Sequence, residues 1–285
     1  MLFDMHTHLY SPALENGTEF SETERNTLAQ KEMEFRRAQK IASCISCGTP
    51  EEWKRMQAYQ ADALLSFGIH PWYSDKYEPE DYIEAFQTCS AVGEIGMDSV
   101  WCSVSLERQE KVFMQQLSIA ADLHKSVILH TKGQERRIAQ LIQDFPEKIC
   151  VHWYSGTIQD LQPYLEKDCY FTLGPDFSVN TKLHHYLIGH LSADRLFLES
   201  DGIASIIWAE QESDDKEKKW DEEMNAGTGM QLDKTGQLAE TFELLPKALR
   251  RSLAAAAAEK KLSEDAFMQI MWANRSVFFF GAQNK

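Results

Sequence analysis

Two histidines, His6 and His8, close the apolar run MLFDMHTHL that opens the chain. If this run is a strand, its residues i and i+2 point to the same face, so both imidazoles can reach one metal ion. Neutral imidazole is a common ligand for zinc and other transition metals. The spacing alone also fits two solvated histidines. Evidence from the rest of the sequence is therefore needed to distinguish a metal site from a solvated strand face.

More histidines and carboxylates stand where later apolar runs should stop. They are His70 after LLSFGI, Glu94 within AVGEIG, His130 after SVIL, His152 after ICV and Asp201 after LFLES. Segments with helical character separate the runs, at 50–62, 106–124, 134–145 and 158–166. Strands that alternate with helices indicate a parallel sheet built from βαβ units. Polar residues at the C-terminal ends of many such strands are typical of a (β/α)8 barrel, whose active site lies at that face.

Eight segments have the composition of buried strands, which is the number that a closed barrel needs. They lie at 2–6, 41–46, 64–70, 91–95, 127–130, 149–152, 170–173 and 196–199. The chain of 285 residues fits this fold, which typically takes about 250. The run Thr49-Pro50-Glu51-Glu52 is typical of a capped helix start with proline in the first turn. We therefore predict an α/β fold, a (β/α)8 TIM barrel, as a single domain over 1–285, with further helices at 238–261 and 263–278.

The motifs, in this order, resemble the TatD-like metal-dependent hydrolases of the amidohydrolase superfamily. The resemblance runs along nearly the whole chain. The matching motifs are the opening His-Thr-His, Gly-Ile-His-Pro at 68–71, Gly-Glu-Ile-Gly-Met-Asp at 93–98, Arg-Gln-Glu at 108–110, Ile-Leu-His at 128–130, His-Trp-Tyr-Ser-Gly at 152–156, Glu-Ser-Asp at 199–201 and Asn-Arg-Ser-Val-Phe at 274–278.

This resemblance implies a barrel that holds two divalent cations. The residues His6, His8, Glu94 and Asp201 would hold one cation, and Glu94, His130 and His152 the other. A carboxylate has two oxygens to share, and two neighbouring metals can hold one hydroxide and stabilise both attacking and leaving oxygens. Such ligands suit zinc, manganese, nickel or cobalt better than magnesium, which prefers oxygen alone.

Four residues would act on water or substrate under the same resemblance. Asp201 and the bridging Glu94 would be catalytic, with Asp201 orienting the attacking hydroxide and accepting its proton. His70 and Lys132 would contact the substrate. Lys132 stands where the family more often has arginine, whose planar fork grips phosphate in a way that lysine cannot.

The segment 202–236 departs from the family pattern after the eighth strand. It begins with Gly202 and continues into an acidic run at 208–223 that contains Trp208 and Trp220. Its alternating charges favour a solvated helix face. The alternative is a lid or specificity element, because a loop after a barrel strand emerges at the active-site face. Residues 11–28 are expected to form a second polar loop, after the first strand.

The net charge of −15 argues against a protein built to bind long nucleic acids, because non-specific affinity for DNA comes mainly from basic side chains. Bound cations would add positive charge at the site itself. The six cysteines do not form a disulfide framework in a chain of this length, and Cys44 and Cys47 fit a buried strand. No apolar run reaches the roughly 18–20 residues of a membrane span, so we expect a soluble, cytoplasmic protein with neither a membrane association nor an evident protein partner.

Three functions remain open from the sequence. The first is a metal-dependent phosphodiesterase or deoxyribonuclease of TatD type, acting on single-stranded DNA or a small phosphoester. The second is an amidohydrolase or lactonase acting on a small carbonyl substrate, which the acidic charge favours. The third is a non-catalytic metal-binding protein, which the complete ligand set disfavours. The anion-binding groups Lys132 and His70, with backbone N–H groups near Gly156 and Gly174, favour phosphoester hydrolysis.

Overall fold

The computed structural model describes residues 1–9, 21–176, 182–210 and 241–281. Eight strands form one parallel sheet in chain order, in which each strand pairs with the next. They are β1 (Leu2–Thr7), β2 (Ile41–Cys47), β3 (Leu64–Phe67), β4 (Ala91–Gly96), β5 (Val127–His130), β6 (Ile149–Val151), β7 (Tyr170–Leu173) and β8 (Leu196–Leu198). The sheet curls into a nearly closed barrel, so the predicted fold class is confirmed.

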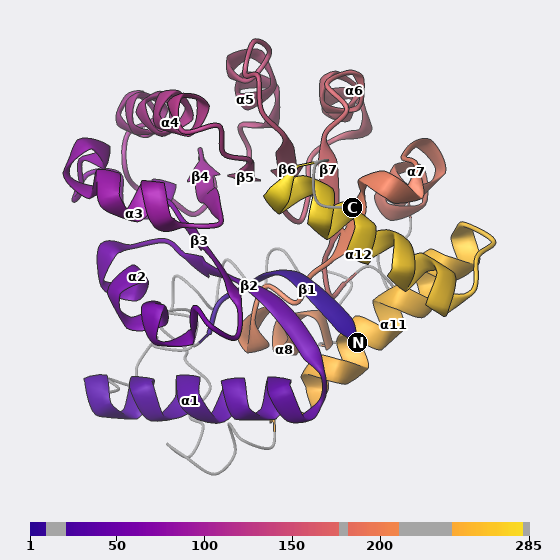
Figure 1. The fold of residues 1–285 in the computed structure, drawn as a ribbon. Helices are drawn as coiled ribbons and strands as arrows, with labels where there is room; N and C mark the ends of the chain where they lie inside the picture. The colour runs from indigo at the N-terminus through magenta and orange to yellow at the C-terminus, as the bar shows by residue number, and fades with distance from the viewer. Residues whose placement is uncertain (10–20, 177–181, 211–240, 282–285) are drawn as a thin grey trace.

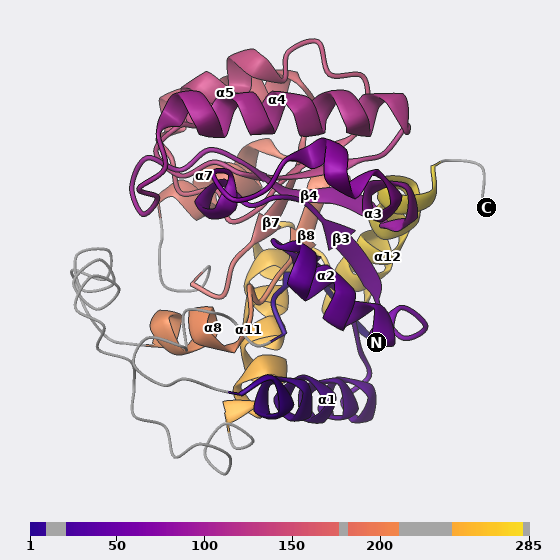
Figure 2. The ribbon, with the colours of Figure 1, turned by 90° about the vertical axis from the view of Figure 1, so that its left-hand side faces the viewer.

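Helices surround the strands, as Figure 1 shows for α2 to α7. The helices are α1 (Glu22–Ala38), α2 (Pro50–Met56), α3 (Ile83–Thr88), α4 (Leu106–Asp122), α5 (Glu135–Leu141), α6 (Ile158–Glu166), α7 (Lys182–His190), α8 (Ile203–Glu210), α11 (Leu244–Glu259) and α12 (Glu264–Phe280). Short 3-10 turns add η2 (Gln57–Tyr59), η3 (Pro71–Tyr73), η4 (Pro79–Tyr82) and η5 (Ala193–Arg195). Figure 2 shows α8 beside α11, which places residues 203–210, the described start of the segment after β8, against the C-terminal helix α11. Among the described residues, no helix is long and apolar enough to span a membrane.

The last helix closes the N-terminal end of the barrel. Phe278 of α12 is buried against the rings of Tyr170 and Phe197, and its carbonyl accepts a hydrogen bond from Ser126 Oγ. Apolar side chains fill the barrel below the strand ends: Phe3, Met5, Cys44, Ala91, Ile128, Cys150, Tyr170, Phe197 and Phe278. A packed core at this end leaves the C-terminal end of the strands for polar side chains.

Several predicted boundaries were wrong. The helices expected over 50–62 and 134–145 end as α-helices at Met56 and Leu141. The polar loop expected over 11–28 gives way to α1 at Glu22, where Ser21 and Glu24 form a reciprocal capping box. The strand expected over 64–70 ends at Phe67, because His70 caps the proline-initiated turn η3. The residues 10–20 and 211–240 lie outside the described part, so Trp220 and most of the 208–223 segment are not described, while Trp208 lies in α8.

Candidate metal centre

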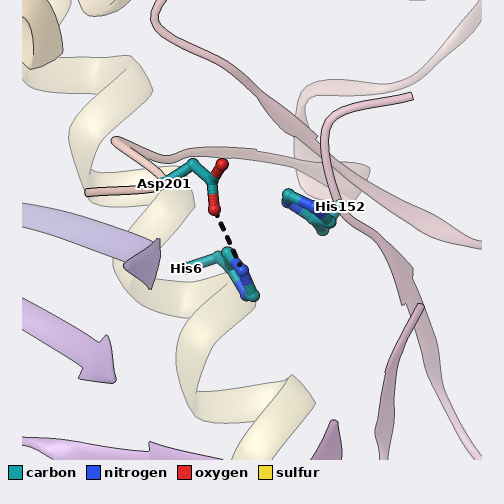
Figure 3. Close-up of side chains that lie close together, drawn as sticks. All are labelled: His6, His152 and Asp201. Carbon is teal, nitrogen blue, oxygen red and sulfur yellow. Dashed lines mark ion pairs between the residues drawn. The ribbon is translucent and has the colours of Figure 1, made fainter. Parts of the chain in front are cut away.

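The six predicted metal ligands all lie at the C-terminal ends of strands. His6 is in β1, Glu94 in β4 and His130 at the end of β5, while His8, His152 and Asp201 follow β1, β6 and β8. Figure 3 shows His6, His152 and Asp201 turned toward one another. The side chains of His6 and Glu94 are almost fully buried, whereas those of His8 and Asp201 are 18% and 17% exposed. The barrel therefore brings together residues from both ends of the sheet, as far apart in the chain as His6 and Asp201.

Glu94 lies between two sets of imidazoles. Its Oε2 is 3.5 Å from His6 Nε2 and 3.4 Å from His8 Nε2. Its Oε1 is 2.7 Å from His130 Nδ1 and 3.1 Å from His152 Nε2. Each carboxylate oxygen thus faces its own pair of histidines, which is the geometry that a shared ligand needs.

Asp201 completes the first of these sets. Its Oδ1 lies 3.4 Å from His6 Nε2 and 3.7 Å from His8 Nε2. Its other oxygen, Oδ2, accepts a hydrogen bond of 2.8 Å from Ser205 Oγ, which fixes the direction of the carboxylate. Nε2 of His6 and of His8 therefore each face one oxygen of Glu94 and one of Asp201.

The donor atoms fit a bound cation. The potential ligand atoms of three groups lie within 4.8 Å of one another: His6, His152 and Asp201; His6, His8 and Glu94; and His70, Glu94 and His130. Among the described residues, neither Nδ1 nor Nε2 of the buried His6 side chain has a hydrogen-bond partner. Because a buried polar atom without a partner costs free energy, an ion coordinated by Nε2 of His6 would offset part of that cost.

The histidines and carboxylates of the cluster shift one another's pKa values. Burial alone would raise the pKa of Glu94, but the neighbouring imidazoles of His152, His70 and His130 hold it well below its usual value. Burial likewise opposes ionisation of Asp201, yet His6 and His152 lower its pKa to about 2. Both carboxylates are therefore ionised at neutral pH, as metal ligands must be.

The histidines respond in the opposite sense. Burial and the neighbouring His152 lower the pKa of His6, but the carboxylates of Asp201 and Glu94 outweigh them and raise it to about 9. His70 differs, because burial dominates and its pKa is lowered. The carboxylates thus attract positive charge to this site, whether it is carried by protons or by a metal ion.

The two predicted substrate contacts lie at different depths. His70 is buried among the ligands, with Nε2 3.7 Å from Glu94 Oε1 and Nδ1 accepting a hydrogen bond from the Trp72 backbone N–H. Lys132 lies on the rim, two residues after β5, where its ammonium is 4.3 Å from the centre of the Trp101 ring. Its Nζ is also 3.4 Å from Ser155 Oγ. His70 thus lies among the groups that surround Glu94, whereas Lys132 lies in the loop after β5 beside Trp101 and Ser155.

Two carboxylates that support the histidines were quoted in the sequence motifs but given no role. Asp98 Oδ2 lies 3.1 Å from His130 Nε2, and Glu199 Oε2 lies 3.2 Å from His152 Nδ1. Carboxylates that bond the second nitrogen of a histidine ligand fix the tautomer and orientation of its ring. One sequence signal could have identified both residues. Each is an acidic residue within four positions of a predicted ligand, in the same apolar run or directly after it.

A nearly closed (β/α)8 barrel with a histidine and carboxylate cluster at its C-terminal end defines the class of barrel metal-dependent hydrolases. The family model described as TatD related DNase matches residues 3–280. The chain therefore belongs to the TatD-related DNase family, as its sequence motifs predict.

Similar sequences support the assignment. The uncharacterized metal-dependent hydrolase YabD of Bacillus subtilis is 22% identical over 214 residues, or 70% of this chain and 80% of YabD. The 3'-5' ssDNA/RNA exonuclease TatD of Pectobacterium parmentieri is 29% identical over 157 residues, 51% of this chain and 60% of that relative. The match with the putative deoxyribonuclease TATDN1 homolog of Vairimorpha ceranae, 26% identical, covers 50% of this chain and 54% of the homolog. The matched regions thus range from about half to four fifths of these relatives.

Solved structures show the same fold over the whole chain. The TatD homolog YJJV from Escherichia coli K12 superposes with a TM-score of 0.67 at 18% identity, covering 98% of this chain and 97% of the homolog. The hydrolase TatD family protein from Entamoeba histolytica gives a TM-score of 0.69 at 14% identity, covering 99% and 98%.

Proposed function

We propose that this protein is a divalent-metal-dependent phosphodiesterase that removes nucleotides from the end of a single strand. The observation that supports it most is the position of Glu94, whose two oxygens face two separate histidine pairs. His6, His8, Glu94 and Asp201 would hold one cation, and Glu94, His130 and His152 a second. When bound, such a pair supplies a water of lowered pKa and positive charge for the phosphoryl oxygens.

The residues of the chain then have distinct tasks in the reaction. The attacking water oxygen forms a bond to phosphorus and its proton passes to the Asp201 carboxylate. The bond from phosphorus to the leaving sugar oxygen breaks, and that oxygen takes the proton from Asp201 to become a hydroxyl. Asp201 is ionised at neutral pH, as a proton acceptor must be, and Ser205 fixes its orientation. Glu94 holds the two ligand sets in a fixed relative position, because each of its oxygens faces one set.

Lys132 and His70 would bind the phosphate. The Lys132 ammonium stands against Trp101 on the rim, where it can reach a phosphate held above the cluster. His70 is buried beside Glu94 with a lowered pKa, so it would reach the phosphate as a neutral imidazole. With a net charge of −15, the protein should bind a few terminal nucleotides and have little affinity for long duplexes. Two TatD relatives named as 3'-5' ssDNA/RNA exonucleases support a single-stranded substrate.

The test is hydrolysis of a 5′-end-labelled single-stranded DNA oligonucleotide with Mn²⁺, Zn²⁺ or Mg²⁺. We expect the oligonucleotide to shorten stepwise. A chelator should abolish this activity, and the Glu94→Gln variant should lack it. Glu110→Gln is the matched control, because Glu110 lies on the outer helix α4 and pairs with Arg137. Intact DNA under every condition, from protein shown to bind metal, would contradict the phosphodiesterase proposal.

A second candidate is hydrolysis of a small carbonyl substrate, an amide or a lactone. The net charge of −15 favours it, because such substrates need no basic surface. Turnover of lactones and aryl esters, measured in parallel with the oligonucleotide, separates the two. Carbonyl hydrolysis that depends on Glu94, without DNA cleavage, would establish the second candidate.

A further inference from the structure

Arg36 of α1 is buried almost completely, with 1% of its surface exposed. Its five N–H donors make five hydrogen bonds: Nε and Nη2 to Glu32 Oε1 at 3.0 and 2.8 Å, Nη1 to Asp4 Oδ2 at 2.8 Å and to Ser43 Oγ at 2.9 Å, and Nη2 to Thr7 Oγ1 at 2.7 Å. A buried arginine needs paired charges and satisfied donors, and Arg36 has both. Such a residue is anchored rigidly to the strands that it contacts.

The same bonds continue from Arg36 to Ser200. Asp4 Oδ1 accepts from the Ser200 N–H at 2.8 Å, and Asp4 Oδ2 accepts from Ser200 Oγ at 2.7 Å. Ser200 Oγ also lies 2.9 Å from Thr7 Oγ1 and accepts from the Gly202 N–H at 3.2 Å. We call Arg36, Asp4, Thr7 and Ser200 the seam network, because they join the start of the barrel, β1, to the end of β8.

This seam is where the strand ladder stops. The ladder runs from β1 to β8 in chain order, and within the described strands no pairing joins β8 back to β1. The backbone contact there is Asp201 N–H to His6 C=O at 3.0 Å. Ser200 directly precedes Asp201, and Thr7 stands between His6 and His8. Side-chain bonds of the seam network therefore fix both halves of the first ligand set at the place where backbone pairing is weakest.

A bulge in β1 makes this connection possible. Asp4 pairs with Ser43 and Thr7 with Ile45, so three steps along β1 match two along β2. In a regular strand, Asp4 and Thr7 would point to opposite faces. The extra residue lets both side chains reach Arg36 outside the barrel, while His6 and His8 point into its mouth, and bulges re-aim side chains in this way next to active sites.

We propose that Arg36 is a positioning residue: through Asp4, Thr7 and Ser200 it sets the position of the His6 and His8 pair relative to Asp201, and thereby the affinity of this set for a divalent cation. The proposal rests on the proposed function only in requiring that these residues bind a cation. It assigns no contact between Arg36 and the substrate. The second set, around His130 and His152, is linked to this network less directly: Glu199, which precedes Ser200, lies 3.2 Å from His152 Nδ1, and the rings of His6 and His152 stack. No hydrogen bond between described side chains joins the seam network to His130, so the effect should be largest on the first set.

The test uses Thr7→Val, which is nearly isosteric and removes the hydroxyl that links Arg36 to Ser200. Binding of Co²⁺ alone is followed by titration calorimetry and by its visible absorption bands, which report coordination geometry. We expect one of two binding events to weaken by about 10- to 100-fold, as for other residues that orient metal ligands. Thr7→Ser, which keeps the hydroxyl, should restore it, and Arg36→Lys should show the loss, because an ammonium lacks the fork that serves Asp4 and Thr7 together.

Ser43→Ala is the matched control, because it also removes one Arg36 hydrogen bond but lies off the path to Asp201. It should bind Co²⁺ as the wild type does, with the same absorption bands. If Thr7→Val does not fold, as judged by its thermal midpoint, Ser200→Ala tests the same link.

Equal Co²⁺ affinity and spectra for Thr7→Val and Ser43→Ala would overturn this inference and leave the proposed function standing. Loss of both binding events in Thr7→Val would also overturn it, since the effect would not be confined to one ligand set. A wild type that binds no cation would overturn both.

Discussion

The carboxylate of Asp98 lies 3.1 Å from Nε2 of His130, on the opposite edge of the ring from Glu94. The same Asp98 oxygen accepts a hydrogen bond of 2.8 Å from Trp72 Nε1, and its other oxygen accepts from the backbone N–H groups of Val100 and Trp101. His130 is thus held between two carboxylates, and Asp98 is itself held by four bonds.

Asp98→Asn should weaken cation binding by about 10- to 100-fold, because an amide nitrogen would face the Trp72 N–H and the charge beside His130 would be lost. Calorimetric titration with Mn²⁺ measures the change. Asp122→Asn, at the exposed end of α4, is the control and should bind as the wild type does. Wild-type affinity in Asp98→Asn would show that the orientation of His130 does not depend on Asp98.

Lys132→Ala should raise KM for the oligonucleotide about tenfold and leave metal binding unchanged, which corresponds to about 1.4 kcal/mol of lost substrate binding. The reason is its place on the rim, against Trp101 and away from the ligand atoms. Steady-state kinetics separates KM from kcat. Lys111→Ala removes a charge from the outer side of α4 and should change neither. A fall in kcat with an unchanged KM would remove Lys132 from substrate binding.

Phe278→Ala should destabilise the protein by about 3–5 kcal/mol, because it leaves a cavity among buried rings at the closed end of the barrel. Phe280, on the same helix, is 48% exposed, so Phe280→Ala should cost less than about 1 kcal/mol. Urea unfolding measures both variants. Equal midpoints would mean that α12 does not seal the barrel as described.

Saturating Mn²⁺ should raise the thermal midpoint by several degrees. An ion at 100 times its dissociation constant stabilises the native state by about 2.7 kcal/mol, and each kcal/mol shifts a protein of this size by roughly 2–4 °C. Mg²⁺ should have a smaller effect, because most of the ligand atoms are imidazole nitrogens. Scanning calorimetry with and without chelator measures the shift, and identical midpoints would count against a cation at this cluster.

Much of the barrel could be predicted from the sequence, because buried parallel strands have short apolar runs and the chemistry lies at their ends. The ends of β5 and β7 are as predicted. The predicted end of β3 was wrong. The apolar run continues to Ile69, but the strand ends at Phe67 and His70 already caps the turn that starts at Pro71. The capping box at Ser21 was present in the sequence as Ser-x-x-Glu, yet the polar composition favoured a loop.

The network around Arg36 could not be predicted. In a helix as polar as α1, an arginine is expected in solvent. Its burial depends on a bulge in β1, 30 residues away, and on Ser200 at the far end of the barrel. The roles of Asp98 and Glu199 likewise depend on which ring nitrogen faces which oxygen, and spacing along the chain does not determine this.

The most direct test of the shared cluster is the number of Mn²⁺ ions that the protein binds, with Glu94→Gln and Glu110→Gln compared to the wild type. We predict two ions for the wild type and for Glu110→Gln, and loss of tight binding for both ions in Glu94→Gln, because Glu94 offers one oxygen to each histidine set. Two tightly bound ions in Glu94→Gln, or none in the wild type, would contradict a metal centre organised by Glu94.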